Sequence, residues 1–413
     1  MKKKNAPRTS ESIVTWETVE DFARLKIQGW FQELLEEEVT ELLGRGHYER
    51  GSVVDAAPGW RNGYGKPRRV SMMAGTITVR RPRVRGLEER FESRLLPLLA
   101  RRTKEVGDLL PELYLHGLSQ GDFELALRGL LGDGAPLSAS SIGRLRAKWQ
   151  LEYEDWMHRR LDDRELVYAW MDGVYVKAGL EKEKAALLVV IGAMSDGTKE
   201  VLAVVPGYRE SKESWKSVLR DLRDRGLSAP KLVVADGNPG CRSAISEIWP
   251  DSKDGRCWNH KIVNVLDQLP KKLQPQAREL LCEVPYSDTR ADAERRRDRF
   301  AKRYRRGYPK AVEILEKDWE AMVAFYDFPE EHWRHLRTTN VVESPFASVR
   351  LRTAAAKRYK KVESATALIW KVLCVVEKRF RKVNAPELMP AVYAGEKFVD
   401  GKPVTSEQRR EAA

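Results

Sequence analysis

The order of apolar and polar residues divides the chain into a mixed first part, an α/β centre and a helical last part. Residues 16–43 place their apolar side chains close to helical spacing and stop before two glycines, which predicts an acidic amphipathic helix. An alternating run at 75–80 predicts a short strand or hairpin. From 108 to 160 the pattern predicts three helices, with a break at 132–138 and good N-cap residues at 138–141.

The pattern changes to strands near residue 164. Apolar runs predict three successive strands at 165–178, 185–194 and 199–206. A helix at 211–226, a fourth strand at 231–236 and a second helix at 239–248 follow. This order predicts an α/β layer that begins with antiparallel strands. The remainder has a helical and charged pattern at 260–335 and again at 341–382, and the last thirty residues, with several Pro and Gly, predict a loose tail.

Length and composition exclude several classes of protein. At 413 residues the chain exceeds the size of one hydrophobic core, so we expect two to four domains. An apolar share of 42% excludes wholesale disorder, and no apolar run is long enough to indicate a membrane span. The four cysteines are too widely spaced for a disulfide framework, and no apolar segment follows the basic first residues. We expect a soluble protein of a reducing compartment.

Basic charge is concentrated in three blocks. The chain has a formal net charge of +13, and residues 61–104, 290–310 and 350–382 carry net charges of +10, +7 and +9. Separate basic blocks suit a protein that grips a polyanion at several places, because each neutralised phosphate releases counterions. Any single block is also compatible with a solvated helix face. The three together indicate nucleic acid as the partner.

The third helix expected between 108 and 160 carries basic residues along its early turns. These are Arg144, Arg146 and Lys148. Three helices with a basic last one resemble a helix-turn-helix module, in which one helix enters the major groove. An ordinary three-helix bundle has the same pattern, and both interpretations stay open.

Two aspartates stand at notable positions on the expected strands. Asp172 lies within the first strand and Asp236 ends the fourth, and a glycine follows each. Sites form at the carboxyl ends of strands in open α/β sheets, and a carboxylate among apolar residues is costly to bury unless a cation compensates it. Asp236 can also simply begin a turn. Two Asp-Gly pairs on strands of one sheet favour a cation-binding or catalytic site over two unrelated turns.

A divalent cation needs further oxygen ligands. Mg²⁺ usually takes a few carboxylates together with substrate phosphates. Glu343 is the candidate third carboxylate, because it stands in an uncharged neighbourhood within an otherwise basic region. Pro345 suits the first turn of a helix, so we expect Glu343 at the start of a helix at 341–351.

Four motifs in order give the sequence a family resemblance. They are Met-Asp-Gly at 171–173, Val-Ala-Asp-Gly at 234–237, Arg-Cys-Trp-Asn-His-Lys at 256–261 and Arg-Thr-Thr-Asn-Val-Val-Glu at 337–343. In this combination the chain resembles the mutator-type transposases of bacterial insertion sequences, the IS256 family, over about 60–380. One departure is Ser-Pro-Phe at 344–346, where many relatives have a charged or Asn-containing stretch.

The resemblance implies a fold and a chemistry. The implied fold is α/β, an RNase H-like mixed-sheet catalytic core with a large all-helical insertion. The helical, helix-turn-helix-like DNA-binding region expected from the pattern at 108–160 precedes it. It implies a catalytic DDE triad, Asp172, Asp236 and Glu343, that holds two Mg²⁺ ions, with Mn²⁺ as a substitute. The separation of 107 positions between Asp236 and Glu343 leaves room for the insertion.

The expected domain organisation follows from these elements. We expect an acidic helical region, a basic hairpin and linker region, a helix-turn-helix-like domain, the first part of the core, the helical insertion, the second part of the core and a flexible tail, at 1–57, 58–107, 108–160, 161–259, 260–335, 336–383 and 384–413.

The family signature also includes residues whose role the sequence does not define. Cys257, His260 and Asn340 are expected around the active site. A zinc site would need four ligands, and no other cysteine has suitable spacing. The alternative to a place at the active site is a purely structural role, with a packed Cys257 and a His260 hydrogen-bonded to the backbone. Other acids are expected in solvated loops or turns, namely Asp162, Asp163, Asp196 and Asp254. A Ser-His hydrolase has no support, because no nucleophile is near the remaining histidines, His47, His116, His158, His332 and His335.

The expected function is therefore metal-dependent cleavage at insertion-sequence ends and strand transfer into target DNA. Partners would be double-stranded DNA, contacted by Arg350 and Arg352 as well as by the basic helix, and further copies of the chain in a homodimer or higher oligomer. The expected location is the bacterial cytoplasm, at the nucleoid. Two alternatives remain: a non-catalytic DNA-binding regulator, and an RNase H-like nuclease without strand transfer.

Overall fold

The computed structural model describes residues 15–49, 59–119, 122–131, 139–179, 184–207, 209–356 and 358–404. The chain divides into two compact units, Met1–Leu145 and Arg146–Ala413. Each unit is described by itself. The break expected at 132–138 and the end of the expected tail, 405–413, lie outside the described residues.

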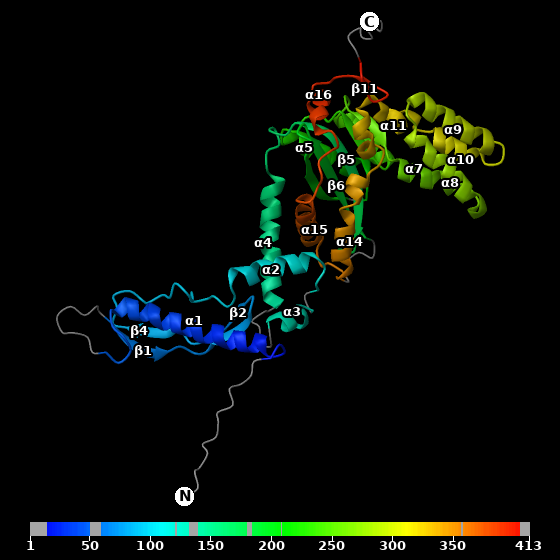
Figure 1. Cartoon of the computed structure of the whole chain (residues 1–413). Coiled ribbons are helices and arrows are strands. Elements are labelled where there is room, and N and C mark those ends of the chain that lie inside the picture. Colours follow the sequence, from blue (N-terminus) through cyan, green and yellow to red (C-terminus); the bar gives the residue numbers. More distant parts are fainter. Residues whose placement is uncertain are drawn as a thin grey trace. The chain divides into compact units, whose positions relative to one another are not determined.

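The first unit packs a long helix against short antiparallel strands (Figure 1). Helix α1 (Val19–Leu43) ends at Gly44, which adopts the left-handed conformation that favours glycine. The strands form two pairs, β1 (Trp60–Tyr64) with β4 (Pro82–Arg85) and β2 (Arg68–Met72) with β3 (Gly75–Val79). Their core contains Leu35, Val70, Ile77, Val79 and Leu96.

Two glutamines of α1 hydrogen-bond to the backbone at β3. Gln28 accepts the Thr78 N–H at 2.8 Å, and Gln32 both accepts the Arg80 N–H and donates to the Arg80 carbonyl at 2.9 Å. These bonds satisfy backbone groups of a short edge strand that has no further strand to pair with among the described residues. The long acidic helix thereby holds the strands that carry the basic block.

Three helices follow, as the sequence predicts. They are α2 (Lys104–Leu115), α3 (Phe123–Leu131) and α4 (Ala139–Met157). The boundary between the two units falls within α4, between Leu145 and Arg146.

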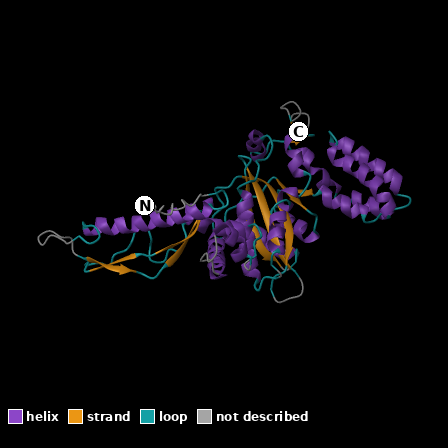
Figure 2. Ribbon diagram, turned by 60° about the horizontal axis from the view of Figure 1, so that its bottom comes forward, coloured by secondary structure: helices purple, strands orange, loops and turns teal. Residues whose placement is uncertain are grey.

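The second unit is built on a five-stranded mixed sheet (Figure 2). The strands are β5 (Leu166–Val176), β6 (Ala185–Met194), β7 (Lys199–Gly207), β8 (Leu232–Ala235) and β9 (Lys253–Arg256), in the order β7-β6-β5-β8-β9. The first three pair antiparallel and the last two parallel, which confirms the expected α/β layer with an antiparallel start. Strand β9 was not predicted, because Lys-Asp-Gly-Arg has no apolar alternation.

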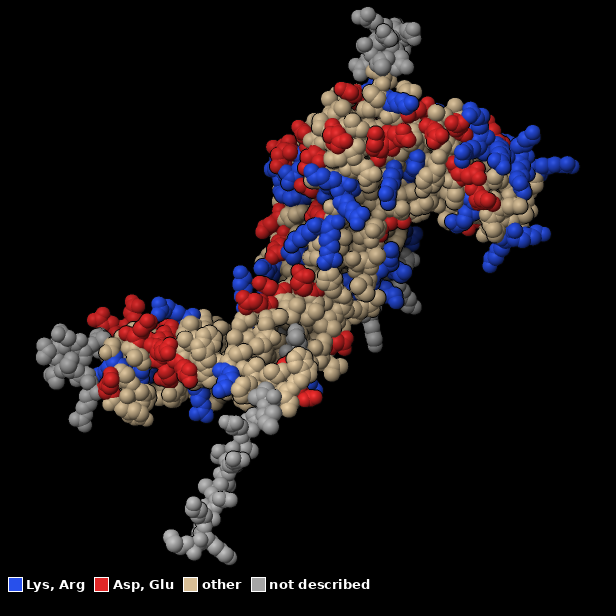
Figure 3. Space-filling view, viewed as in Figure 1, with Lys and Arg blue, Asp and Glu red and all other residues tan. Residues whose placement is uncertain are grey.

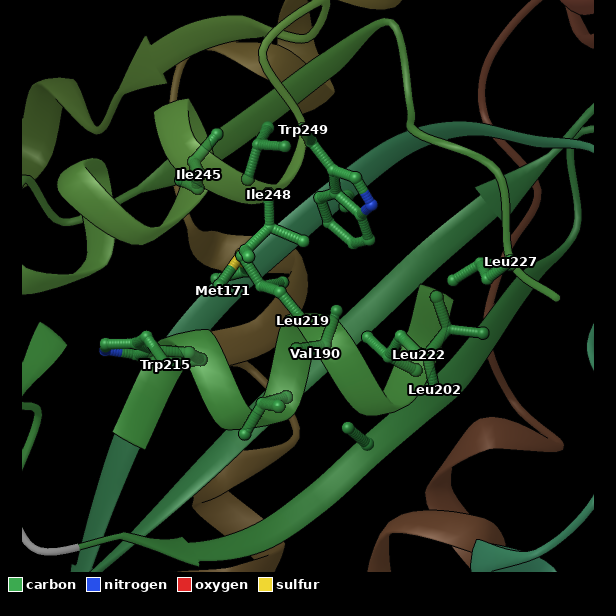
Figure 4. Close-up of a cluster of buried hydrophobic side chains, with 14 of the residues drawn as sticks. Met171, Val190, Leu202, Trp215, Leu219, Leu222, Leu227, Ile245, Ile248 and Trp249 are labelled. Atoms are coloured by element: carbon green, nitrogen blue, oxygen red, sulfur yellow. The ribbon is translucent and has the colours of Figure 1, made fainter. Parts of the chain in front are cut away.

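Alternation along β5 assigns its side chains to two faces. Ala169 and Met171 belong to the buried cluster that also contains apolar side chains of α5 (Lys212–Asp224) and α6 (Pro239–Ile248) (Figure 4). In Figure 4, Met171 lies among Trp215, Leu219 and Ile248. This cluster makes one face of the central strand a conventional hydrophobic core.

Tyr168 and Trp170 alternate to the other face, where polar hydrogen bonds accompany the packing. The Tyr168 hydroxyl lies 2.8 Å from His332 Nδ1, and the Trp170 indole donates to the His335 carbonyl at 2.9 Å. By the same alternation Asp172 belongs to this face. Helix α15 (Val362–Glu377) contacts β7, and α16 (Met389–Tyr393) contacts β5.

Every element between 260 and 335 is helical, in agreement with the pattern of that segment. These elements are α7 (Trp258–Leu266), η1 (Lys271–Leu273), α8 (Gln274–Glu283), η2 (Val284–Tyr286), α9 (Arg290–Tyr304), α10 (Pro309–Glu316), α11 (Trp319–Val323), η3 (Ala324–Asp327), η4 (Glu330–His332) and α12 (Trp333–Leu336). Helices α7 to α10 lie together beside the sheet (Figures 1 and 2). Lysine and arginine side chains gather over this group (Figure 3).

The helix expected at 341–351 is interrupted, so the expectation for Glu343 was wrong in detail. Glu343 is the last residue of the short helix α13 (Asn340–Glu343), and α14 (Phe346–Ala354) begins after Pro345. Proline has no N–H to continue the first helix, and it serves as the N-cap of the second. The carboxylate is therefore held at a helix end rather than at a helix start.

The prediction of a loose tail was wrong for residues 384–404. This segment forms η5 (Pro386–Leu388), α16, β10 (Phe398–Val399) and β11 (Lys402–Pro403). Met389, Val392 and Phe398 are buried, so a few apolar residues between prolines and glycines suffice to pack it. No described helix of either unit has the length and apolarity needed to cross a membrane.

Candidate active site

The register of β5 and β8 brings Asp172 and Asp236 together. The two strands are parallel neighbours, and their last paired residues are Met171 and Ala235. Each aspartate is the next residue along its strand, and neighbours in register point to the same face. The predicted pair therefore lies side by side at the carboxyl end of β8.

A third carboxylate that the sequence did not indicate completes this cluster. Glu210 lies between β7 and α5, and carboxylate oxygens of Asp172, Glu210 and Asp236 all lie within 4.8 Å of one another. Gly173 makes the approach possible, because a Cβ there would lie 2.3 Å from Glu210 Oε1. A side chain at position 173 would therefore displace the Glu210 carboxylate from its place beside Asp172.

Glu343 approaches from α13 and lies against α7. A carboxylate oxygen of Glu343, Cys257 Sγ and a ring nitrogen of His260 lie within 4.8 Å of one another. His260 Nδ1 is 3.8 Å from Glu343 Oε1, and the Thr339 hydroxyl donates to the same carboxylate. The structure therefore groups Glu343 with the Cys-His pair as its immediate neighbours, beside the three-carboxylate cluster.

Three hydrogen bonds fix the segment 337–340 on 256–259, and a fourth fixes Trp258 on the helical segment before it. The Trp258 N–H donates to the Arg337 carbonyl at 2.9 Å, and the Thr339 N–H donates to Cys257 Sγ at 3.3 Å. Asn259 Nδ2 donates to Asn340 Oδ1 at 3.3 Å, and the Trp258 indole donates to the Met322 carbonyl at 2.8 Å. Cys257 thus acts through Thr339 on Glu343.

Arg256 and Lys261, the ends of the same motif, anchor it in the interior. Arg256 is 7% exposed and lies against Gly237, where a Cβ would be 0.8 Å from the Arg256 Nη1 atom. Lys261 is 2% exposed and lies 3.5 Å from Asp318, which also pairs with Arg242. Arg256 Nε also lies 4.0 Å from Asp318, so this carboxylate compensates the charges of both Arg256 and Lys261, and burying either charge unpaired would be strongly unfavourable.

The cluster is electrostatically strained without a cation. Burial, together with the charges of Asp236, Glu343 and Glu210, raises the pKa of Asp172 to about 7, although the Gly173 N–H donates to it. Burial and Asp236 also raise the pKa of Glu210, against a hydrogen bond from Tyr175. Close carboxylates that raise one another's pKa are the expected signature of a cation site.

The Cys-His pair behaves as an ionic couple. The hydrogen bond with Cys257 raises the pKa of His260 to about 9, against the effect of burial. Burial alone would raise the pKa of Cys257, but hydrogen bonds from His260 and Thr339 lower it overall. Cys257, His260 and Glu343 offer three ligand atoms, one fewer than the four of a closed zinc site. In this structure the Cys-His pair places a cationic imidazole beside the Glu343 carboxylate.

The predicted DNA-contacting residues have different exposures. Arg144, Lys148 and Arg350 are exposed, and Arg146 is half-buried. Arg352 is only 2% exposed, so its side chain has no access to a phosphate in this structure. We therefore withdraw Arg352 from the expected DNA-contacting set.

Asp254 was wrongly expected in a solvated loop. It lies on β9 and pairs with Arg242 at 2.5 Å, and burial raises its pKa. Together with Asp318 it neutralises Arg242 behind the site. The sequence offered no signal for this role, because Asp318, which shares Arg242 with Asp254, lies 64 residues further along the chain.

Comparison with known sequences identifies the family of this arrangement. A profile of the family described as "Transposase, Mutator family" matches residues 2–383. The chain belongs to the Mutator family of transposases. It is 43% identical over 297 residues to the transposase for insertion sequence element IS6120 of Mycolicibacterium smegmatis, covering 72% of this chain and 92% of that one.

Two further relatives extend the comparison. The transposase for element IST2 of Acidithiobacillus ferrooxidans is 44% identical over 280 residues, covering 67% of this chain and 95% of that one. The transposase for element IS256 in transposon Tn4001 of Staphylococcus aureus is 26% identical over 368 residues, covering 88% and 92%. These findings confirm the IS256-type resemblance that the four motifs indicated.

Proposed function

We propose that this transposase cuts DNA at the ends of its insertion sequence and joins the freed 3′-hydroxyl to target DNA, with Asp172, Asp236 and Glu343 as its catalytic carboxylates. The observation that carries the proposal is that two aspartates on neighbouring strands, Glu210 and the Glu343 helix converge in one unit of a Mutator-family chain. A DNA-binding protein without catalysis has no need of such a cluster, since the carboxylates repel phosphate.

The donor set fits a hard divalent cation. Three carboxylate oxygens within 4.8 Å of one another suit Mg²⁺ or Mn²⁺, which prefer oxygen ligands. We propose that Asp172, Asp236 and Glu343 hold two ions and that Glu210 contributes an additional oxygen. When bound, these ions would supply activation of the attacking oxygen and stabilisation of the leaving oxygen.

The protein's own groups would prepare this site. Asp172 must give up its proton before it can bind a cation near neutral pH, because its pKa is raised to about 7. Thr339 donates to Glu343, and Cys257 accepts from the Thr339 N–H, so the α7 start holds the catalytic glutamate in place. His260 adds a positive charge on the Glu343 side of the carboxylates.

The topology supports an RNase H-like core. We propose that β5 to β9 with α5 and α6 form its first part, and that residues 336–383 form its second part with Glu343. Helices between 260 and 335 would then be the insertion. The support is the mixed strand order with aspartates on two adjacent strands.

The first unit carries a surface suited to the DNA backbone. A concavity of about 640 Å³ is lined by basic side chains of the strands and of the following loop, namely Lys66, Arg68, Arg69, Arg81, Arg83 and Arg101. Burial, Arg81 and Arg101 all lower the pKa of Arg68, so an anion would relieve their repulsion. We propose that this unit, with the helices α2 to α4, binds the element ends.

The DNA substrate also implies where and how the chain works. We propose that it acts in the cytoplasm at the nucleoid, as a homodimer or higher oligomer that holds two DNA ends.

A strand-transfer assay separates this proposal from its alternatives. A duplex of the element end with a pre-cut 3′-hydroxyl is incubated with target plasmid and Mg²⁺ or Mn²⁺. Joined products support a transposase. A nuclease would only cut the DNA, and a regulator would bind without either product.

A further inference from the structure

A second concavity, about 420 Å³ in volume, opens beside the candidate active site in the second unit. Four of its lining residues are cationic, Arg334, Arg337, Arg381 and Lys382, and none of the described lining residues is acidic. A concavity of this size accommodates a small-molecule-sized group rather than a duplex. Its charge selects an anion.

Two amide side chains connect this concavity to the active site. Asn340 begins α13, the helix that ends at Glu343, and Asn259 precedes His260 on α7. They are hydrogen-bonded to each other at 3.3 Å. A third amide, Asn384, also lines the concavity. Amides both donate and accept, which is the chemistry that reads the edge of a nucleobase.

An exposed aromatic ring adds a stacking surface. Tyr286 ends η2 and is 68% exposed. The Arg337 guanidinium lies 4.8 Å from its ring centroid and is also placed over Phe325 at 5.2 Å and Trp333 at 5.5 Å. Arg337 thus supports the ring from within the protein, and the ring stays open to a flat ligand.

The wall around Asn384 is fixed to the sheet. The Val383 N–H donates to the Gly197 carbonyl at 2.9 Å, and the Lys382 ammonium donates to the Asp196 carbonyl at 3.1 Å. The Asn384 N–H donates to His335 Nε2 at 3.2 Å. A preorganised wall loses little conformational entropy when a ligand binds.

We propose that this pocket receives one nucleotide of the DNA strand, turned out of the duplex next to the position of the cut. This rests on the proposed function, because it assigns a subsite to the same DNA substrate. The base would stack on Tyr286 and hydrogen-bond to the asparagines, while the phosphates face the arginines. A phosphate alone would require only the cations, whereas three amides and an exposed ring are what a base requires.

Photo-crosslinking tests the proposal directly. The full-length chain is bound, with Ca²⁺ in place of Mg²⁺, to duplexes of the element end and its flank. Each duplex carries 5-iodouracil at one position near the cut. We expect one position to crosslink, and the modified peptide to contain Tyr286.

Variants of the same tyrosine give the second measurement. Tyr286→Ala should lower the rate of strand transfer by about 5- to 100-fold, the loss of one base–aromatic stack, while Tyr286→Phe stays near the wild-type rate. Val399→Ala is the control, because Val399 is an exposed apolar residue (61%) of the same unit that lines neither the pocket nor the carboxylate cluster. Circular dichroism confirms that the variants fold.

The outcomes distinguish this inference from the proposed function. If the wild-type chain joins DNA, crosslinks map away from Tyr286 and Tyr286→Ala joins at the wild-type rate, the nucleotide pocket is wrong and the transposase assignment stands. If the wild-type chain neither cuts nor joins DNA with any divalent metal, the proposed function itself fails.

Discussion

Asp172 is the residue whose protonation most directly reports a cation site. Its pKa is raised to about 7 by burial and by the carboxylates around it. A metal binds only the deprotonated form, so binding must release this proton. We expect Mn²⁺ affinity to rise by about tenfold per pH unit below about pH 7 and to level off above it.

Isothermal titration calorimetry in buffers of different ionisation enthalpy counts the protons released. About one proton should leave per ion bound near pH 6, and fewer near pH 8. The raised pKa of Glu210 adds to the release in the same direction. An affinity that is constant from pH 6 to pH 8 would contradict the assignment of Asp172 as a ligand.

A second prediction for a single residue concerns the contribution of Glu210 to metal binding. Glu210→Gln removes a charge within 4.8 Å of both aspartates and should weaken Mn²⁺ binding by roughly 10- to 100-fold, as loss of a supporting oxygen does in other metal sites. Glu213→Gln is the control, because its side chain is 75% exposed on the adjacent first turn of α5. Equal Mn²⁺ affinities in the two variants would exclude Glu210 from the site.

The sequence predicted the two aspartates and the glutamate but not Glu210. Asp172 and Asp236 stand on recognisable strands, and Glu343 belongs to a motif of the family. Glu210 follows the end of β7 in a charged loop, and only the antiparallel return of that strand brings it to Gly173. A contact made by the folding of distant segments leaves no local pattern to read.

At the scale of elements, the turn after β8 depends on one glycine. Gly237 has φ of 86°, and a Cβ there would coincide with the Arg256 guanidinium. Gly237→Ala should destabilise the chain by about 1–3 kcal/mol from the backbone alone, with more from displacing a buried cation. Urea unfolding measures the change.

Gly307→Ala is the matched control, since it lies in the same unit, with no heavy atom within 4 Å of the new methyl and no positive φ. Its free energy of unfolding should stay near the wild-type value. If Gly237→Ala were equally stable, the close packing of Arg256 beneath the Asp-Gly turn would be wrong.

Element prediction from the sequence succeeded where periodicity was strong. The strands β5 to β8 and the helices around them follow apolar runs. Strand β9 was not predicted because its sequence has no apolar alternation. Backbone pairing with β8 and the ion pair of its Asp254 with Arg242, which also pairs with Asp318, hold it in place. The segment 384–404 was mistaken for a tail because three buried side chains spread between prolines and glycines do not form a period.

At the scale of the whole molecule, we expect the first unit by itself to bind DNA but not to cut it. A fragment of residues 1–160 contains the basic strands and the helices α2 to α4 but none of the clustered carboxylates. It should bind element-end duplex without cutting it, with affinity that falls steeply as salt rises. Fluorescence anisotropy at several salt concentrations measures both properties.

The full-length chain is the reference for that fragment. If full-length protein binds element ends at low salt and the fragment, shown to be folded by circular dichroism, binds no DNA, then the first unit is not the DNA-binding part. The domain assignment would then have to move to the basic helices of the second unit.

The measurement that tests the central claim most directly compares wild-type and Glu343→Gln proteins on one labelled element end, recording DNA binding and strand transfer in parallel with Mg²⁺. Glutamine keeps the shape but removes the charge that would hold the metal, which should cost several kcal/mol of transition-state stabilisation. We predict that binding persists while cleavage and strand transfer fall together by orders of magnitude, as they should for Asp172→Asn and Asp236→Asn. Near-full strand transfer by Glu343→Gln would contradict the account and place the third carboxylate elsewhere.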